Sequence, residues 1–120
     1  MSSSSAIYVI IDIFVKAEKS EYGKKILYGL VDQSKKEDGC MRYRLCENLT
    51  DKTHFTIIEQ WESEENYEEH LQSEHIKKAG EQLKDDFLKP VEEKRYKSVH
   101  IDNNMKKTIP KNSSSFCTIL

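Results

Sequence analysis

The chain has 120 residues, of which 37% are hydrophobic and 33% are charged, and it carries a formal net charge of −2. This length predicts one domain with a small core, and the charge balance gives no electrostatic basis for nucleic-acid binding. No apolar run approaches the ~18 residues of a membrane span, and no signal peptide opens the chain. We therefore expect a cytoplasmic protein.

The three cysteines fit a reducing compartment. Cys40, Cys46 and Cys117 show no C-x-x-C spacing and form an odd set, so neither a zinc site nor a disulfide framework is indicated. Cys40 and Cys46 are six residues apart in one strand-like run, where we expect both to point to the same face.

The first half of the domain alternates between strand and helix patterns. Residues 1–5, a methionine and four serines, form an expected disordered leader. Residues 6–15 predict a strand that is apolar on both faces and therefore covered on both sides. Residues 18–36 carry apolar residues at helical spacing, and Asp38-Gly39 predicts the turn that ends this helix.

The second half repeats these patterns. Ser63 and Ser73 are candidate helix N-caps, each followed by glutamate in the first turn, where the helix dipole favours anions. Pro90 ends the second of these helices. The expected elements are a strand at 40–47, a hairpin loop at 48–52, a strand at 54–62, helices at about 64–71 and 74–87, and a strand at 95–101.

The predicted order is β-α-β-β-α-(α)-β. This is an α+β, ferredoxin-like sheet with its helices on one face. Because the first strand is apolar on both sides, the other face of the sheet also needs a cover, and a second copy of the same sheet is the simplest one. We therefore expect a homodimer with two sheets face to face, a dimeric α/β-barrel.

Three groups of residues carry a family resemblance. They are Asp38-Gly39-Cys40 before Tyr43, then Ile58-Glu59-Gln60-Trp61-Glu62-Ser63, then His70-Leu71 with Ser73-Glu74-His75. In this order and on these elements, they resemble the antibiotic biosynthesis monooxygenase (ABM) superfamily over residues 6–101, with bacterial quinol monooxygenases as the nearest likeness. The resemblance implies a small dimeric barrel that acts without metal, flavin or other cofactor.

The implied reaction is the oxygenation of a quinol or related aromatic phenol by dioxygen. Such a reaction needs a base for the phenolic proton, donors for the oxyanion and an apolar slot that excludes water. His70, three residues after Tyr67 on one helical face, is the candidate proton acceptor. Tyr67 is the candidate hydrogen-bond donor. Asp12 is the third candidate catalytic residue, with a raised pKa if its side of the strand faces the barrel.

Four further residues are candidates for substrate binding. Trp61 matches a family pocket position and offers a ring wall, and Glu59 lies two residues earlier on the same side of the strand. His75 begins the next helix, and Tyr43 lies on the apolar side of its own strand.

Other activities within the family stay open. Haem cleavage is disfavoured, because the position of an axial histidine is matched by Gly80. Isomerisation of a small phosphorylated metabolite would need a cationic phosphate cradle, for which Arg42 and Arg44 are the candidates. A non-catalytic barrel that binds a small ligand in the same pocket is a further alternative.

The tail, residues 102–120, is polar and is expected to be flexible. It ends in Cys117-Thr118-Ile119-Leu120, a C-a-a-X sequence whose terminal leucine predicts geranylgeranylation of Cys117. A prenyl group would make the protein a lipoprotein held peripherally on a membrane, with Lys106, Lys107 and Lys111 adding attraction to anionic lipid.

Overall fold

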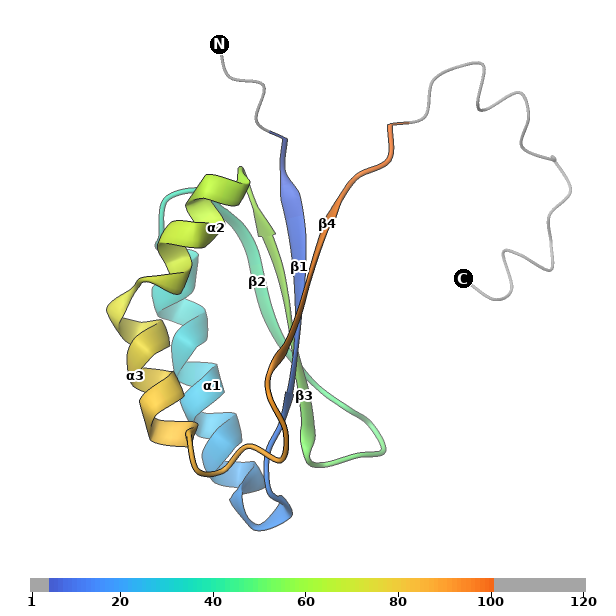
Figure 1. Cartoon of the computed structure of the whole chain (residues 1–120), viewed down its shortest axis with the longest axis vertical. Coiled ribbons are helices and arrows are strands. Elements are labelled where there is room, and N and C mark those ends of the chain that lie inside the picture. The colour runs from blue at the N-terminus through green and yellow to red at the C-terminus, as the bar shows by residue number, and fades with distance from the viewer. Residues whose placement is uncertain (1–4, 101–120) are drawn as a thin grey trace, which may run out of the picture.

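The computed structural model describes residues 5–100. Within that range, four strands form one antiparallel sheet and the helices cover one of its faces (Figure 1). The elements are β1 (Ile7–Phe14), the 3-10 helix η1 (Ala17–Lys19), α1 (Ser20–Lys35), β2 (Cys40–Glu47), β3 (His54–Trp61), α2 (Glu64–Leu71), α3 (Glu74–Leu83) and β4 (Glu92–Lys97). The predicted ferredoxin-like α+β fold is confirmed.

The strand order is β2-β3-β1-β4, and each neighbouring pair is antiparallel. Residues directly opposite one another in such pairs share a face of the sheet, so the register divides the side chains. The covered face, toward the helices, carries Val9, Ile11, Ile13, Tyr43, Leu45, Phe55, Ile57, Glu59, Trp61, Glu93 and Arg95. The open face carries Tyr8, Ile10, Asp12, Phe14, Arg42, Arg44, Cys46, His54, Thr56, Ile58, Gln60, Lys94 and Tyr96.

The hydrophobic core lies between the covered face and the helices. Strand residues such as Val9 and Trp61, both without exposed surface, meet Leu27 and Leu30 of α1 and Leu83 of α3. The alternation in β3, where every second residue is buried, follows from this one-sided cover.

Two predicted boundaries were wrong. The last strand runs over Glu92–Lys97, so it begins three residues and ends four residues earlier than expected, because its register is set by pairing with β1. Its charged sequence is typical of an edge strand, so a search for alternating hydrophobic residues does not detect it. Helix α3 ends at Leu83 instead of residue 87; Asp86 N–H bonds Leu83 C=O in a closing turn, and Phe87 then bridges to Val15.

A β-bulge at the start of β2 also corrects the sequence interpretation. Cys40 pairs with Trp61 but Arg42 pairs with Gln60, so Met41 is an additional residue in this strand. The bulge places Cys40 on the covered face, while Cys46, opposite Thr56, lies on the open face. The expectation that the two cysteines share a face was therefore wrong.

Some predictions fall on residues that the structure does not describe. They are the leader, apart from Ser5, and the tail with its prenylation sequence at Cys117, which stay predictions. Among residues 5–100, no helix has both the length and the apolar character needed to cross a bilayer.

Candidate functional site

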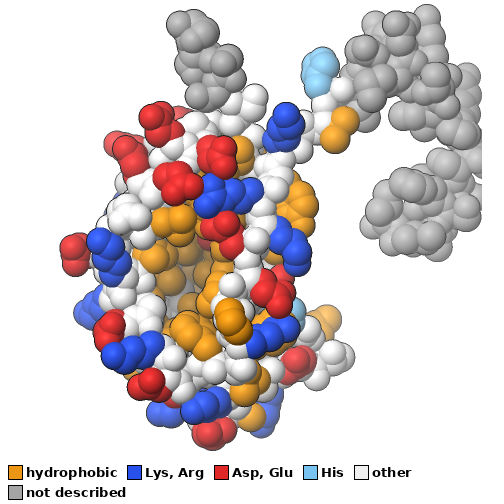
Figure 2. All heavy atoms as spheres, viewed as in Figure 1, with side chains coloured by type: hydrophobic (Ala, Val, Ile, Leu, Met, Phe, Trp, Pro, Cys, Tyr) orange, Lys and Arg blue, Asp and Glu red, His pale blue; other side chains and the backbone are white. Residues whose placement is uncertain are grey.

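A cavity of about 210 Å³ opens between the covered face and the helices. Figure 2 shows it as a hollow lined by hydrophobic side chains and rimmed by acidic and basic ones. Its walls come from the four strands, from α1, α2 and α3, and from the segment between α3 and β4. The lining residues are Ile11, Ile13, Leu27, Leu30, Tyr43, Ile57, Glu59, Tyr67, His70, Leu71, Ile76, Ala79, Gly80, Leu83, Phe87, Val91 and Glu93. Small-molecule pockets span about 300–1,000 Å³, so this one suits a small, mainly apolar ligand.

A buried carboxylate lies in the cavity wall. Glu59 is 1% exposed, and its Oε1 accepts a hydrogen bond from Trp61 Nε1 at 2.8 Å. Burial raises the pKa of the Glu59 carboxyl to about 7; the Trp61 bond opposes this rise, and the charges of Glu37 and Glu93 add to it. An acid that changes protonation near neutrality in an apolar wall is a candidate for proton transfer.

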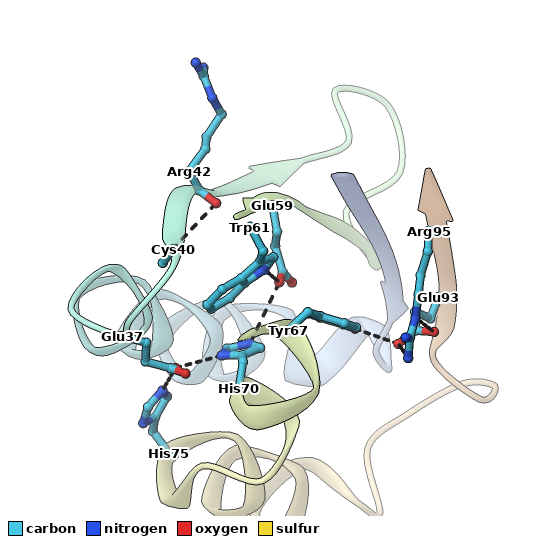
Figure 3. Close-up of polar contacts among 10 residues, drawn as sticks. All are labelled: Glu37, Cys40, Arg42, Glu59, Trp61, Tyr67, His70, His75, Glu93 and Arg95. Carbon is cyan, nitrogen blue, oxygen red and sulfur yellow. Dashed lines mark hydrogen bonds and ion pairs between the residues drawn. The ribbon is translucent and has the colours of Figure 1, made fainter. Parts of the chain in front are cut away.

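A buried imidazole lies beside this carboxylate (Figure 3). His70 is 1% exposed, and its Nε2 lies 3.9 Å from Glu59 Oε1. Its Nδ1 lies 2.7 Å from Glu37 Oε2. A carboxylate only accepts hydrogen bonds, so Nδ1 carries the proton of a neutral ring and Nε2 presents a lone pair toward Glu59. Burial lowers the pKa of His70, with Glu37 acting in the opposite direction.

Local sequence places these groups. A turn from Glu37 to Cys40 follows α1; Gly39 has a φ of 81°, a conformation that favours glycine, and a bond from Cys40 N–H to Glu37 C=O closes the turn. At the other side, Ser63 caps α2 by accepting a hydrogen bond from Asn66 N–H at 3.1 Å. This cap fixes the helix that carries Tyr67 and His70.

Hydrogen bonds and ion pairs join α2 to β4 at one side of the cavity. Tyr67 donates its hydroxyl to Glu93 at 2.6 Å, and Glu93 accepts from Arg95 at 3.0 Å. The Arg95 guanidinium also bonds Glu64 and Glu68 of α2 and lies 4.8 Å from the centre of the Tyr67 ring. Burial opposes ionisation of Glu93, but the hydrogen bonds from Arg95 and Tyr67 outweigh it and lower the pKa.

Comparison with known proteins identifies the family of this chain. The family described as antibiotic biosynthesis monooxygenase matches residues 6–82. The chain belongs to this family. The match covers β1 to α3, the elements that carry Glu59, Trp61, Tyr67 and His70.

Individual proteins are similar to this chain in sequence or in structure. An uncharacterized protein of Synechocystis is 30% identical over 91 residues, which is 76% of this chain but only 62% of that protein. The chain thus spans less than two thirds of this curated relative. A crystal structure from Pseudomonas aeruginosa is 24% identical with a TM-score of 0.77, covering 83% of this chain and all of that one. A conserved protein of Methanosarcina mazei is 28% identical with a TM-score of 0.74, covering 81% and 96%.

Of the seven candidate site residues named in the sequence analysis, four line the cavity. They are Tyr43, Glu59, Tyr67 and His70. The Tyr67 hydroxyl is held by Glu93 rather than directed at His70, so in this structure Tyr67 contributes its ring as a wall. Burial raises the pKa of both tyrosines.

Two other candidate residues, Trp61 and His75, do not line the cavity but contact residues that do or that support them. Trp61 is fully buried, 4.7 Å from the His70 ring, and supports Glu59 rather than lining the cavity. His75 does not line the cavity either; its Nε2 lies 2.6 Å from Glu37 Oε2. Ser73, expected to cap α3, stands at the N-cap position but makes no capping bond through its side chain.

The placement of Asp12 is a correction. Asp12 lies on the open face, where its carboxylate accepts hydrogen bonds from His54 Nε2 at 2.7 Å and Thr56 Oγ1 at 2.8 Å. Burial opposes ionisation there, but these bonds outweigh it, and the pKa is lowered rather than raised. The sequence showed that Asp12 shares a side with Tyr8 and Phe14, but not which side the helices cover.

Three residues of the site were missed in the sequence. Glu37 precedes the predicted turn without any motif, and Glu93 and Arg95 precede or begin the strand that was placed too late. Each meets a partner across a long sequence separation: 33 residues for Glu37 and His70, 26 for Tyr67 and Glu93, and 31 for Glu64 and Arg95. No local pattern indicates such pairs; only a correct β4 register would have placed Glu93 on the covered face.

Proposed function

We propose that this ABM protein is a cofactor-independent monooxygenase that oxidises a small quinol or related aromatic phenol with dioxygen. The observation that carries the proposal is the imidazole of His70, which is oriented by Glu37 through Nδ1 and presents Nε2 beside Glu59 at an apolar cavity. This is the arrangement of an oriented general base.

The cavity supports an aromatic substrate. The rings of Tyr43 and Tyr67 and aliphatic side chains form its walls, and its charged lining residues, Glu59 and Glu93, are both acids. Acidic walls disfavour an anionic ligand, whereas a neutral ring with a hydroxyl group can donate a proton to His70 or Glu59. The apolar side chains of the wall also limit the water that can reach the anion that forms.

In the proposed reaction, His70 Nε2 accepts the proton of a substrate hydroxyl. The electron-rich anion then reduces dioxygen, one oxygen atom forms a bond to a ring carbon, and the other leaves as water. A naphthoquinol with one molecule of dioxygen gives a hydroxynaphthoquinone and one molecule of water, so quinol and dioxygen supply all electrons and atoms. His70 returns its proton to the departing oxygen.

The geometry does not support the isomerase alternative. Arg42 and Arg44, the candidates for a phosphate cradle, pair with Gln60 and Ile58 and lie exposed on the open face. In Figure 3 the Arg42 side chain points away from the site. A phosphorylated ligand in the cavity would meet carboxylates instead of these guanidinium groups.

The test is oxygen uptake by chelator-treated protein with a panel of reduced naphthoquinols. We expect uptake faster than autoxidation, loss of most of it in His70→Gln and Glu59→Gln, and little change in the matched control His54→Gln on the open face. With ¹⁸O₂, one labelled atom should enter the product.

Two results would count against the proposal. Uptake equal to the protein-free blank across the panel, with oxidised naphthoquinones still bound, would favour the non-catalytic binding barrel. Equal loss in His70→Gln and His54→Gln would show that the cavity does not hold the base.

We also propose that two chains pair through their open faces. The open face carries partly buried Ile10, Phe14 and Ile58, which no helix within residues 5–100 covers. A self-complementary sheet face suits an isologous dimer. Sedimentation equilibrium should give twice the chain mass, and Ile58→Glu should give a monomer. A monomeric wild-type protein would contradict this assembly.

A further inference from the structure

Three side chains from three elements meet behind the cavity wall. Glu37 follows α1, His70 stands in the last turn of α2 and His75 in the first turn of α3. Nδ1 of His70 and Nε2 of His75 lie 2.7 and 2.6 Å from the same oxygen, Oε2 of Glu37. One ligand atom from each residue falls within 4.8 Å of the others, and Figure 3 shows both rings converging on the carboxylate.

The chain must break a helix to achieve this convergence. In a continuous α-helix, residues five apart point about 140° away from each other, since each residue turns by about 100°. Here α2 ends at Leu71 and α3 begins at Glu74, and the junction turns both imidazoles toward Glu37. Such an arrangement is not a by-product of one amphipathic helix face.

Two imidazole nitrogens and one carboxylate oxygen form a donor set typical of Zn²⁺. Zinc binds these groups at about 2.0–2.2 Å, and sites with three protein ligands keep a fourth position for water. An ion between the three atoms would replace the hydrogen bonds to Glu37 while the carboxylate withdraws slightly. His70 is buried, whereas the Glu37 and His75 side chains are 19% and 15% exposed, which gives an ion a path from solvent.

We propose that Glu37, His70 and His75 form a binding site for a divalent metal ion of the zinc class. Glu37 and His75 do not line the cavity, so the ion would sit behind the His70 ring and would not touch a ligand in the cavity. The site would therefore act on the imidazole rather than on the substrate.

Metal binding changes which atom His70 presents to the cavity. With Nδ1 bound to the ion, the neutral ring carries its proton on Nε2, the atom that lies 3.9 Å from Glu59. The pocket-facing nitrogen then donates a hydrogen bond and no longer accepts a proton. This inhibitory consequence rests on the proposed function, whereas binding of the ion does not.

The first experiment measures Zn²⁺ binding by calorimetry on full-length, chelator-treated protein. We expect one ion per chain, about tenfold to hundredfold weaker binding in His75→Ala and Glu37→Gln, and unchanged binding in His54→Ala. Circular dichroism on each variant confirms folding, and Glu37→Gln keeps the size of the side chain. Equal affinity in all four proteins, or no binding by the wild type, would overturn the site.

Cobalt identifies the ligands independently of activity. Co²⁺ bound to nitrogen and oxygen gives visible bands without the near-ultraviolet charge-transfer band of a cobalt–thiolate bond. We expect such a spectrum in the wild type and its loss in His75→Ala. A thiolate band that survives in His75→Ala would place the ion on a cysteine and overturn the proposal.

Oxygen uptake with and without Zn²⁺ separates the two proposals. Zinc binding without oxygen uptake, with or without zinc, would support the metal site and count against the oxygenase. Oxygen uptake without zinc binding would support the oxygenase and count against the metal site. Uptake that zinc inhibits in the wild type, but not in His75→Ala, would support both.

Discussion

On each side of the sheet, a histidine is hydrogen-bonded to a carboxylate, and the two hydrogen bonds have the same length. His70 Nδ1 lies 2.7 Å from Glu37 on the helix side, and His54 Nε2 lies 2.7 Å from Asp12 on the open face. The second nitrogen differs. Nδ1 of His54 lies 3.0 Å from the Asn48 side-chain amide, whereas Nε2 of His70 makes no hydrogen bond among residues 5–100.

This difference decides which imidazole is available for chemistry. His54 uses both ring nitrogens and stacks on Phe14 with ring centres 4.2 Å apart, so its contacts are structural. His70 is fixed through one nitrogen and leaves the other at an apolar cavity. The distance between a histidine and a carboxylate therefore does not identify a base; the surroundings of the other nitrogen do.

The largest expected effect tests the burial of the covered face. Trp61→Ala removes a fully buried indole that contacts His70 and bonds Glu59, and we expect a loss of about 3–5 kcal/mol in the free energy of unfolding. Phe14→Ala, on the open face, should cost less than about 2 kcal/mol in a monomer. Urea denaturation measures both. Equal losses would show that the open face is as deeply buried in solution as the covered one.

The next effect concerns the pH dependence of stability from Glu59. The pKa of Glu59 in the fold, about 7, exceeds the ordinary value of 4.5. Its contribution to the free energy of unfolding is therefore fully present below pH 4.5 and is lost as the pH rises through about 7. The loss is on the order of 3 kcal/mol at most. In chelator-treated protein, the stability of wild type relative to Glu59→Gln should fall over this window. Parallel pH profiles of the two proteins would contradict the raised pKa.

The covered face also depends on the turn that presents Glu37. Gly39 has a positive φ, and a Cβ there would collide with the Asn66 side chain of α2. Gly39→Ala should cost about 2 kcal/mol or more in stability. The matched control is Gly29→Ala, an exposed helical position where a new Cβ meets nothing within 4 Å, which should gain about 0.5–1 kcal/mol. Thermal unfolding that ranks both substitutions alike would refute this account of the turn.

The contrast between the two faces also shows how far sequence reasoning reached. Alternation and capping residues gave the order of strands and helices, because hydrophobic period and turn chemistry are local. They placed Tyr43, Glu59, Tyr67 and His70 on elements that meet at one cavity. Glu59 shares a face with Trp61 because residues two apart on a strand always do.

The failures have a common physical cause. A strand that is apolar on both sides, such as β1, does not reveal which side the helices cover. The sequence therefore does not show that Asp12 lies on the face opposite the cavity. Glu37, Glu93 and Arg95 act through contacts between distant segments. Charged residues in a turn or an edge strand have the same local pattern whether or not they meet a buried partner.

The smallest expected effect is on the open face, and its pH dependence has the opposite sign to that of Glu59. The hydrogen bonds from His54 and Thr56 outweigh burial and lower the pKa of Asp12, so its contribution is present above its ordinary value of 3.8 and is lost as the pH falls through the lowered value. Because the pair is partly exposed, Asp12→Asn should cost less than about 1 kcal/mol at neutral pH and nothing in acid. Urea denaturation against pH measures this difference, with Thr56→Val as a control that removes one donor but keeps His54. A cost for Asp12→Asn that grows as the pH falls would mean that the Asp12 carboxyl is protonated in the fold. Asp12 on the open face would then have a raised pKa, as this structure assigns to Glu59 on the covered face.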